Sequence, residues 1–378
     1  MPKTLKEDIT PMRAYTIRTI LAALVVGLLL PLVAIPARAQ DQTWTPRPVT
    51  ASVRGAGVNS PTPLYNAWIR AYKDVNPSAE IKYDSVGTAA AVAEFLEYKA
   101  DFSGLDIALP TERIIHEAPD TLHIPMVIGG VVPVYNVPYL PENTTLRFSP
   151  TTLAGIFLGQ IKRWNDPAIA ADNPGVPLPS IPIKVLYRSD NARNSLTMSE
   201  YLSSVSPEWQ SRIGSGTWVP WPTGLGYSSN SRVMNKLMWT PGAISYIDLV
   251  FALENKLPLP PIKNAAGNYV VPTTESLMAA AESTEMPADL RTPIANAKAE
   301  NAYPLAGFTY ILIRQQTYTD VEKAQALTDF LYWSLTEGQG ATVRLGYAPL
   351  PENVRHRAIE QLRKVRVGGE QVFDGPVK

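Results

Sequence analysis

Hydrophobic and polar residues follow two different periods along the chain, and these periods predict strands that are each followed by a helix. Residues 49–54 alternate as in a half-buried strand. They run into a Gly-Ala-Gly sequence at residues 55–57, where we expect a turn in which the backbone comes close to another group. A helix should follow, because Pro63 is tolerated in a first helical turn and apolar residues recur at helical spacing from Leu64 to Tyr72.

The same order of elements recurs in the next part of the chain. Residues 80–83 are predicted to form a short strand, and residues 87–89 form a turn of small residues before a second amphipathic helix. A further strand should end just before Asp106. This order is typical of parallel α/β sheets, whose ligands bind at the carboxyl ends of strands against helix N-termini. We therefore predict an α/β fold.

Two dense apolar runs lie far apart in the sequence. Residues 127–135 contain Gly129 and Gly130 and are predicted to form a buried strand that crosses between two lobes. Residues 308–313 are a candidate for the return crossing, and the pattern at residues 319–337 is again helical. A chain of 378 residues is long enough for two domains.

The N-terminus has the pattern of an export signal. Arg13 and Arg18 precede an apolar run at residues 19–35, and Ala37 and Ala39 supply the small residues of a cleavage site. Cleavage there would remove residues 1–39. The alternative is an uncleaved anchor, since the run is almost long enough to span a bilayer. The chain has no cysteine, which excludes disulfides and a lipid-modified N-terminal cysteine. We predict a periplasmic or secreted protein.

Composition and motifs argue against several functions. The formal net charge is zero and no basic cluster occurs, so we expect no nucleic-acid partner. The three histidines lack metal-ligand spacing. No Gly-x-Ser-x-Gly motif, complete dinucleotide fingerprint or phosphate-loop lysine motif is present. We therefore expect no catalytic residues, no metal and no cofactor, which leaves binding.

Four loops carry groups that suit an anion, which needs converging backbone N–H groups, hydroxyls, amides and an arginine. These loops hold Asn59 with Ser60, then Thr88, then Asp106, and lastly residues 188–195. Each has an ordinary structural alternative as well. Asn59, Thr88, Asn194 and Asp106 could be helix caps, and Arg188 could belong to a surface ion pair.

Several collinear segments resemble the periplasmic phosphate-binding proteins of phosphate ABC importers. The resemblance runs from about Val53 to the C-terminus. The matching segments are residues 55–57, 101–106 (DFSGLD), 127–132 (VIGGVV), 156–166 (IFLGQIKRWND), 221–226 (WPTGLG), 241–246 (PGAISY) and 345–351 (LGYAPLP).

The resemblance implies a type II periplasmic binding protein fold, in which two discontinuous α/β lobes are joined by two hinge crossings. The implied organisation is a signal peptide at residues 1–39, a first part of lobe 1 at 40–127, lobe 2 at 128–305, and the return of lobe 1 at 306–378. The implied function is to bind inorganic phosphate between the lobes, without catalysis, and to deliver it to a membrane ABC permease. Family members generally act as monomers.

The resemblance also assigns site residues one by one. Asn59 and Ser60 stand where the family has a threonine and a backbone N–H donor, and Thr88 stands where it has a serine. Asp106 matches the aspartate that accepts the proton of the bound phosphate. Arg188 and Asp190 match the family's arginine and the aspartate two residues later. Such an acceptor separates phosphate from sulfate, which has no proton to give near neutral pH.

One loop departs from the family pattern. The family typically has Asp-Gly-Ser-Gly-Thr after its arginine, whereas this chain has Asp190, Asn191, Ala192, Arg193 and Asn194. Three outcomes are open at this stage. In the first, Arg193 points inward and replaces the lost hydroxyls with charge. In the second, Asn59 and Asn194 serve as amide donors. In the third, the pocket binds another oxyanion or small polar anion, or has lost its ligand. A sensor or partner-binding role on the same scaffold is a further alternative.

Overall fold

The structure is a computed structural model, and it describes residues 44–377. The predicted signal peptide at residues 1–39 lies outside the described residues and stays a prediction. Within the described range no helix is both long enough and apolar enough to cross a lipid bilayer.

The main feature of the described chain is a sheet of eight strands in the order β2-β1-β3-β10-β4-β7-β5-β6. Neighbouring strands are parallel, except that β10 is antiparallel to both β3 and β4, and β4 is antiparallel to β7. The strands are β1 Ala51–Gly57, β2 Ala79–Ser85, β3 Phe102–Leu105, β4 Thr121–Asn136, β5 Lys184–Arg188, β6 Leu225–Tyr227, β7 Ala243–Asp248 and β10 Ala306–Arg314.

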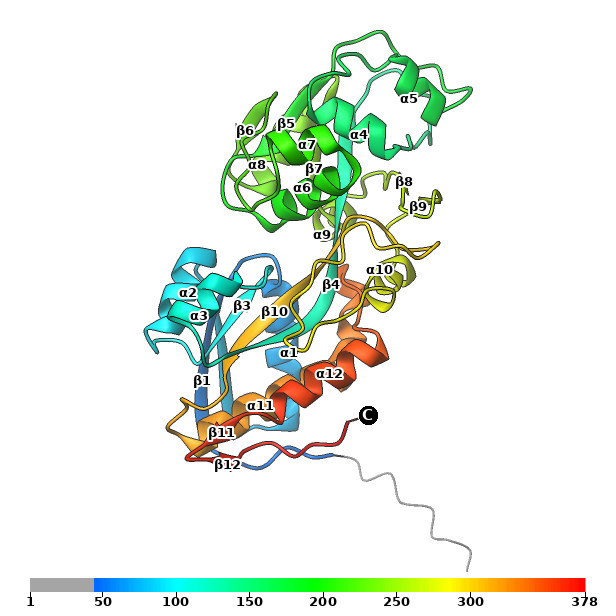
Figure 1. Cartoon of the computed structure of the whole chain (residues 1–378). Coiled ribbons are helices and arrows are strands. Elements are labelled where there is room, and N and C mark those ends of the chain that lie inside the picture. Colours follow the sequence, from blue (N-terminus) through cyan, green and yellow to red (C-terminus); the bar gives the residue numbers. More distant parts are fainter. Residues whose placement is uncertain (1–43, 378) are drawn as a thin grey trace, which may run out of the picture. The chain divides into compact units, whose positions relative to one another are not determined.

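Strand β4 belongs to two halves of this sheet (Figure 1). Its residues 121–130 pair with β10, and its residues 131–136 pair with β7. The apolar run at residues 127–135 is therefore confirmed as a buried strand, since it forms part of β4. Strand β10 pairs only with β3 and with residues 121–130 of β4. From Ala306 onward the chain therefore belongs to the same half of the sheet as β1, β2 and β3.

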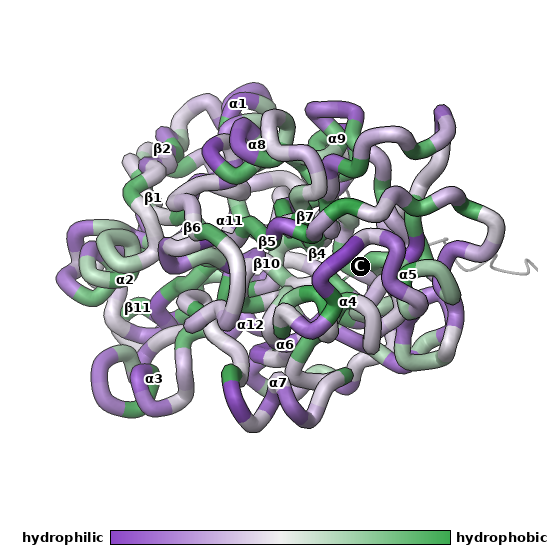
Figure 2. Tube along the Cα trace, turned by 90° about the horizontal axis from the view of Figure 1, so that it is seen from above, coloured by the Kyte–Doolittle hydropathy of each residue, from purple (hydrophilic) through white to green (hydrophobic). Residues whose placement is uncertain are grey.

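Helices connect the strands, as the α/β prediction requires (Figure 1). Figure 2 shows hydrophilic residues on outer segments such as α3. The helices are α1 Thr62–Val75, α2 Thr88–Leu96, α3 Thr111–Glu117, α4 Pro150–Phe157, α5 Pro167–Asp172, α6 Arg193–Val205, α7 Pro207–Arg212, α8 Asn230–Met238, α9 Leu249–Glu254, α10 Thr274–Glu282, α11 Val321–Leu335 and α12 Glu352–Leu362. Two 3-10 helices, η1 Glu337–Ala341 and η2 Val343–Leu345, and two small hairpins, β8 Ile262–Lys263 with β9 Tyr269–Val270 and β11 Arg366–Val367 with β12 Glu370–Gln371, complete the elements.

Helix α1 shows why the apolar period predicted a helix at this place. It begins with proline in its first turn, where the missing N–H group has no helical partner to lose. Its buried face holds Leu64, Trp68 and Tyr72, which recur at helical spacing. The indole Nε1 of Trp68 donates to the carbonyl oxygen of Gly338 at 2.7 Å, so the buried polar atom is satisfied.

The predicted turn at residues 55–57 is wrong, because these residues complete strand β1. The close approach of the backbone that was also predicted here is confirmed. A Cβ atom on Gly55 would overlap the ring of Phe102, and one on Gly57 would overlap the hydroxyl of Tyr83 and lie 2.5 Å from the carbonyl oxygen of Gly104. Glycine therefore allows β1 to lie beside bulky aromatic neighbours.

Changing Gly57 to alanine is expected to lower the free energy of unfolding by about 1 to 3 kcal/mol, since the methyl group overlaps a side chain and a backbone oxygen. Urea unfolding of the purified protein measures the change. Gly340→Ala is the matched control, because a Cβ atom at Gly340 meets no heavy atom within 4 Å. Equal stability of the two variants would contradict the close-approach explanation.

Candidate functional site

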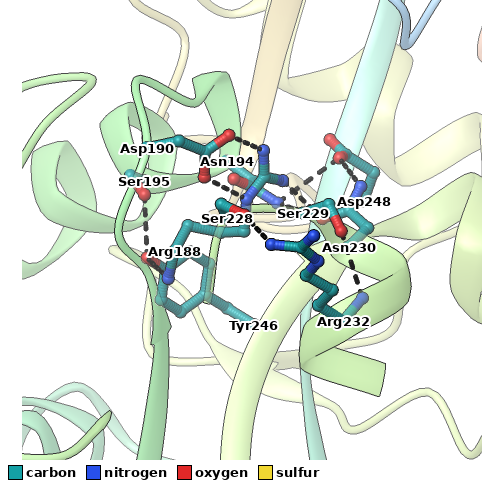
Figure 3. Close-up of polar contacts among 10 residues, drawn as sticks. All are labelled: Arg188, Asp190, Asn194, Ser195, Ser228, Ser229, Asn230, Arg232, Tyr246 and Asp248. Atoms are coloured by element: carbon teal, nitrogen blue, oxygen red, sulfur yellow. Dashed lines mark hydrogen bonds and ion pairs between the residues drawn. The ribbon is translucent and has the colours of Figure 1, made fainter. Parts of the chain in front are cut away.

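Arg188 ends strand β5 and is held in place by a planar ion pair (Figure 3). Its Nε donates to Oδ1 of Asp190 at 2.8 Å, and its Nη2 donates to Oδ2 of the same carboxylate at 2.8 Å. The side chain is only 12% exposed. The alternative of a surface ion pair is therefore wrong. A forked pair of this kind fixes the plane of the guanidinium group and aims its remaining donors.

Two asparagines and an aspartate extend this ion pair into a network (Figure 3). Nη1 of Arg188 donates to Oδ1 of Asn230 at 2.7 Å, and Nδ2 of Asn230 donates to Oδ2 of Asp248 at 2.7 Å. Nδ2 of Asn194 donates to Oδ1 of Asn230 at 2.8 Å and lies 3.4 Å from Oδ2 of Asp248. The amide nitrogen of Asn194 is thus already engaged, so this side chain is not the free amide donor that the loop suggested.

Arg193 is the first residue of α6, and its side chain is buried with only 5% exposure. Its Nη2 donates to Oδ1 of Asp248 at 2.7 Å. The guanidinium group lies against two strands of the sheet, since a Cβ atom on Gly129 of β4 would be 3.0 Å from Nη2 and one on Gly307 of β10 would be 3.4 Å from Nη1. Nε and Nη1 are buried and have no hydrogen-bond partner among the described residues.

Asp106 follows strand β3 and receives a hydrogen bond from the hydroxyl of Ser60 through its Oδ2 atom. The hydroxyl of Tyr347 donates to the carbonyl oxygen of Ser60 at 2.7 Å, which fixes this loop. Burial raises the pKa of Asp106 to about 6, although the positive charge of Arg193 opposes the shift. Its Oδ1 atom is buried without a partner among the described residues.

The structure brings most of the predicted residues together. The charges of Arg193, Asp248 and Arg188 all act on the carboxyl group of Asp106. Asn230 joins Asn194 to Arg188, because its Oδ1 accepts a hydrogen bond from both side chains. Asn59 differs, because it is exposed and its Oδ1 accepts a hydrogen bond from Ser85. Thr88 is half-buried at the first position of α2.

The alternative that these polar residues are helix caps is wrong. The residues at the cap positions are Pro61 for α1, Gly87 for α2, Pro110 for α3 and Ala192 for α6. None of the four provides a side-chain hydrogen bond to its helix. Hydroxyl, amide and carboxyl groups close to these helix starts are therefore not used for ordinary capping.

Four residues of the site were missed from the sequence. Asn230 and Asp248 complete the network, Tyr347 holds the Ser60 loop, and the hydroxyl of Tyr246 accepts from the backbone N–H of Arg188 at 3.1 Å. Both tyrosines lie in segments that carried the family resemblance. Asp248 could have been found as a carboxylate at the end of a buried strand, which is where ligand sites form in α/β sheets.

Metal binding has no support in the described part of the chain, where no group of three His, Cys, Asp or Glu side chains could hold an ion. The buried His123 is used structurally. Its Nε2 accepts from the backbone N–H of Leu109 at 3.1 Å, and burial lowers its pKa to about 3.

The fold and this anion-suited cluster are those of a periplasmic binding protein, and residues 41–337 match the model of the PBP superfamily domain. The chain belongs to the PstS family of phosphate-binding proteins. It is 36% identical over 307 residues to the phosphate-binding protein PstS of Xylella fastidiosa, which covers 81% of this chain and 83% of that protein. It is 30% identical to the phosphate-binding protein PstS of Methanocaldococcus jannaschii, over 94% of this chain and 98% of the relative.

Solved structures agree with this fold. The ancestral soluble variant of the human phosphate binding protein superposes with a TM-score of 0.63 at 19% identity, covering 81% of this chain and 92% of that one. A periplasmic phosphate-binding protein, PfluDING, bound with phosphate at pH 8.5, superposes with a TM-score of 0.61 at 20% identity, covering 81% and 92%.

Proposed function

We propose that this protein is a receptor that binds inorganic phosphate at the Asp106 and Arg188 cluster and delivers it to a membrane ABC importer. The observation that carries the proposal is the forked Arg188–Asp190 pair, which fixes a guanidinium group whose charge acts on Asp106, a carboxyl group with an unpartnered Oδ1. The role is not catalytic, in line with relatives that are named as binding proteins.

The donors and acceptors of the cluster suit a protonated tetrahedral oxyanion. A guanidinium group has five N–H donors. Arg188 uses three in its bonds to Asp190 and Asn230, and Arg193 uses one in its bond to Asp248. The remaining donors supply the charge-assisted hydrogen bonds that the lost hydroxyls of the loop would have made. Arg193 thus strengthens the site instead of closing it.

Asp106 is the group that favours phosphate over sulfate. An ionised carboxylate repels an oxyanion that has no proton. It accepts a hydrogen bond from a protonated oxyanion. Ser60 is held against Oδ2 of this carboxylate, so Oδ1 is the atom left for the ligand. In this proposal Thr88 and Asn59 would contribute a further hydroxyl and a further amide group.

The wider proposal follows the family. The two halves of the sheet that share β4 would be the lobes of a type II binding protein, with residues 40–127 and 306–378 in one and residues 128–305 in the other. Movement at the two crossings would close the lobes over the anion and change the face offered to the permease. The mature protein would be a periplasmic monomer.

Calorimetry with the mature chain tests the proposal. We expect inorganic phosphate and arsenate to release heat on binding, and sulfate at the same concentration to release none. Tight binding of sulfate, or of another anion in place of phosphate, would overturn the ligand assignment. Loss of phosphate uptake when the gene is deleted would test delivery to the importer.

A further inference from the structure

The orientation of the Asn194 amide can be deduced from its neighbours. Arg188 can only donate hydrogen bonds and the carboxylate of Asp248 can only accept them. Asn230 lies between these two groups, so its Oδ1 must face Arg188 and its Nδ2 must face Asp248. Asn194 contacts the same Oδ1 of Asn230 and must therefore present its nitrogen there.

This orientation leaves the Asn194 carbonyl oxygen as an unused acceptor. Its Oδ1 atom is buried and has no hydrogen-bond partner among the described residues, and the whole residue is 1% exposed. A buried acceptor without a donor costs free energy, so a missing donor is expected at this place. The family has a hydroxyl at this position, which can either donate or accept, whereas the Asn194 oxygen can only accept.

The cluster therefore holds two unpartnered acceptors, Oδ1 of Asp106 and Oδ1 of Asn194, and two unpartnered donor atoms, Nε and Nη1 of Arg193, whose charge acts on Asp106. Its formal charges also oppose a doubly charged ligand. The arginines at 188 and 193 are each paired with a carboxylate, Asp190 and Asp248. An ionised Asp106 then leaves the cluster with one excess negative charge.

We propose that this site selects the monovalent, doubly protonated form of its tetrahedral oxyanion, dihydrogen phosphate, with one hydroxyl donating to Asp106 and the other to Asn194. The inference rests on the proposed function, and it adds the protonation state of the ligand. The two unprotonated oxygens of the ion receive the N–H groups of Arg188 and Arg193, so every polar atom of the ion has a partner.

The acceptor role of Asp106 sets the pH range of the experiment. Because burial raises the pKa of this carboxyl group to about 6, it is mainly ionised above that pH, where both of its oxygens can only accept. The charged and titratable groups that act on Asp106, or on which it acts, are Arg188, Arg193, Asp248, Tyr65, Tyr83 and Tyr347. Burial raises the pKa of each of these tyrosines, so they stay neutral in this range.

The test is calorimetric titration with phosphate at about pH 6.5, 7.5 and 8.5. The fraction of dihydrogen phosphate falls as pH rises through its second ionisation, so the Kd for total phosphate is expected to increase by about tenfold for each pH unit above it. A Kd that is unchanged or lower at about pH 8.5 overturns the inference and leaves the proposed function standing. Absence of phosphate binding at all three pH values overturns the proposed function.

A second ligand shows whether affinity depends on the number of hydroxyl groups of the anion or only on its charge. The phosphite monoanion has the same charge as dihydrogen phosphate and is smaller, but it carries one hydroxyl instead of two. We expect it to bind at least about fivefold more weakly, per monoanion at about pH 6.5, because one buried acceptor stays unpaired. Equal affinity of the two monoanions would contradict a second acceptor.

The variant Asn194→Thr replaces the acceptor by a hydroxyl that can also donate. We expect the ratio of Kd values at about pH 8.5 and 6.5 to decrease by at least about threefold relative to the natural chain. This ratio does not change if the variant merely loosens the network, because such damage weakens binding at both pH values. An unchanged ratio in a variant that melts at the natural temperature would overturn the role of Asn194.

Discussion

Replacing Arg188 with alanine is expected to weaken phosphate binding by about 2 to 5 kcal/mol, which is an increase in Kd of about 30-fold to 5,000-fold. The guanidinium group is the fixed charge partner of the anion, and its loss also leaves the Asp190 carboxylate with no arginine to neutralise it. Arg188→Lys should bind more weakly than the natural chain as well, since an ammonium group cannot make the forked bond to Asp190. Isothermal titration calorimetry measures both variants.

The control for this prediction is Arg212→Ala. Arg212 lies on α7 with its side chain 55% exposed, and its ion pair with Glu208 involves neighbouring turns of the same helix. Removing it changes the total charge by the same amount as removing Arg188. Phosphate affinity should be unchanged in Arg212→Ala, and a similar loss in both variants would show that Arg188 acts only through the overall charge.

Changing Asp248 to alanine is expected to lower the free energy of unfolding by about 3 to 5 kcal/mol. The carboxylate is the ion-pair partner of the buried Arg193 and accepts from Asn230, so its loss leaves a buried positive charge unpaired. Urea unfolding without phosphate measures the loss. The double variant Arg193→Leu with Asp248→Leu should recover most of it, because two apolar residues leave no buried charge.

An exposed ion pair provides the comparison. Arg113 and Glu117 lie one turn apart on α3 with side chains 39% and 49% exposed, and their Nε and Oε2 atoms are 2.8 Å apart. Glu117→Ala should lower the free energy of unfolding by less than about 1 kcal/mol. If Asp248→Ala costs no more than this control, the Arg193 pair does not hold α6 against the sheet.

The sequence was sufficient for features that depend on neighbours in the chain. Apolar periods predicted the strand at residues 127–135 and the helix at residues 319–337, which the structure confirms as parts of β4 and as α11. The apolar pattern also predicted that a strand ends just before Asp106, and the structure has β3 end at Leu105.

The remaining features depend on residues that only the fold brings together. Asp248 contacts Arg193 from 55 positions away, and no local pattern connects the two. Glycine is typical both of turns and of close approach, and both were expected at residues 55–57. Phe102 and Tyr83, which decide between these cases, come from other strands of the sheet. The acceptor role of Asn194 likewise follows from the positions of its partners.

Arg193 cannot be exchanged with the family's glycine as a single residue. Its guanidinium group lies close to Gly129, where a Cβ atom would be 3.0 Å from Nη2, and its charge is neutralised by Asp248. Transplanting the arginine alone into a relative without a carboxylate at the position of Asp248 would leave an isolated buried positive charge. The arginine and the aspartate are thus a pair that has to be exchanged together.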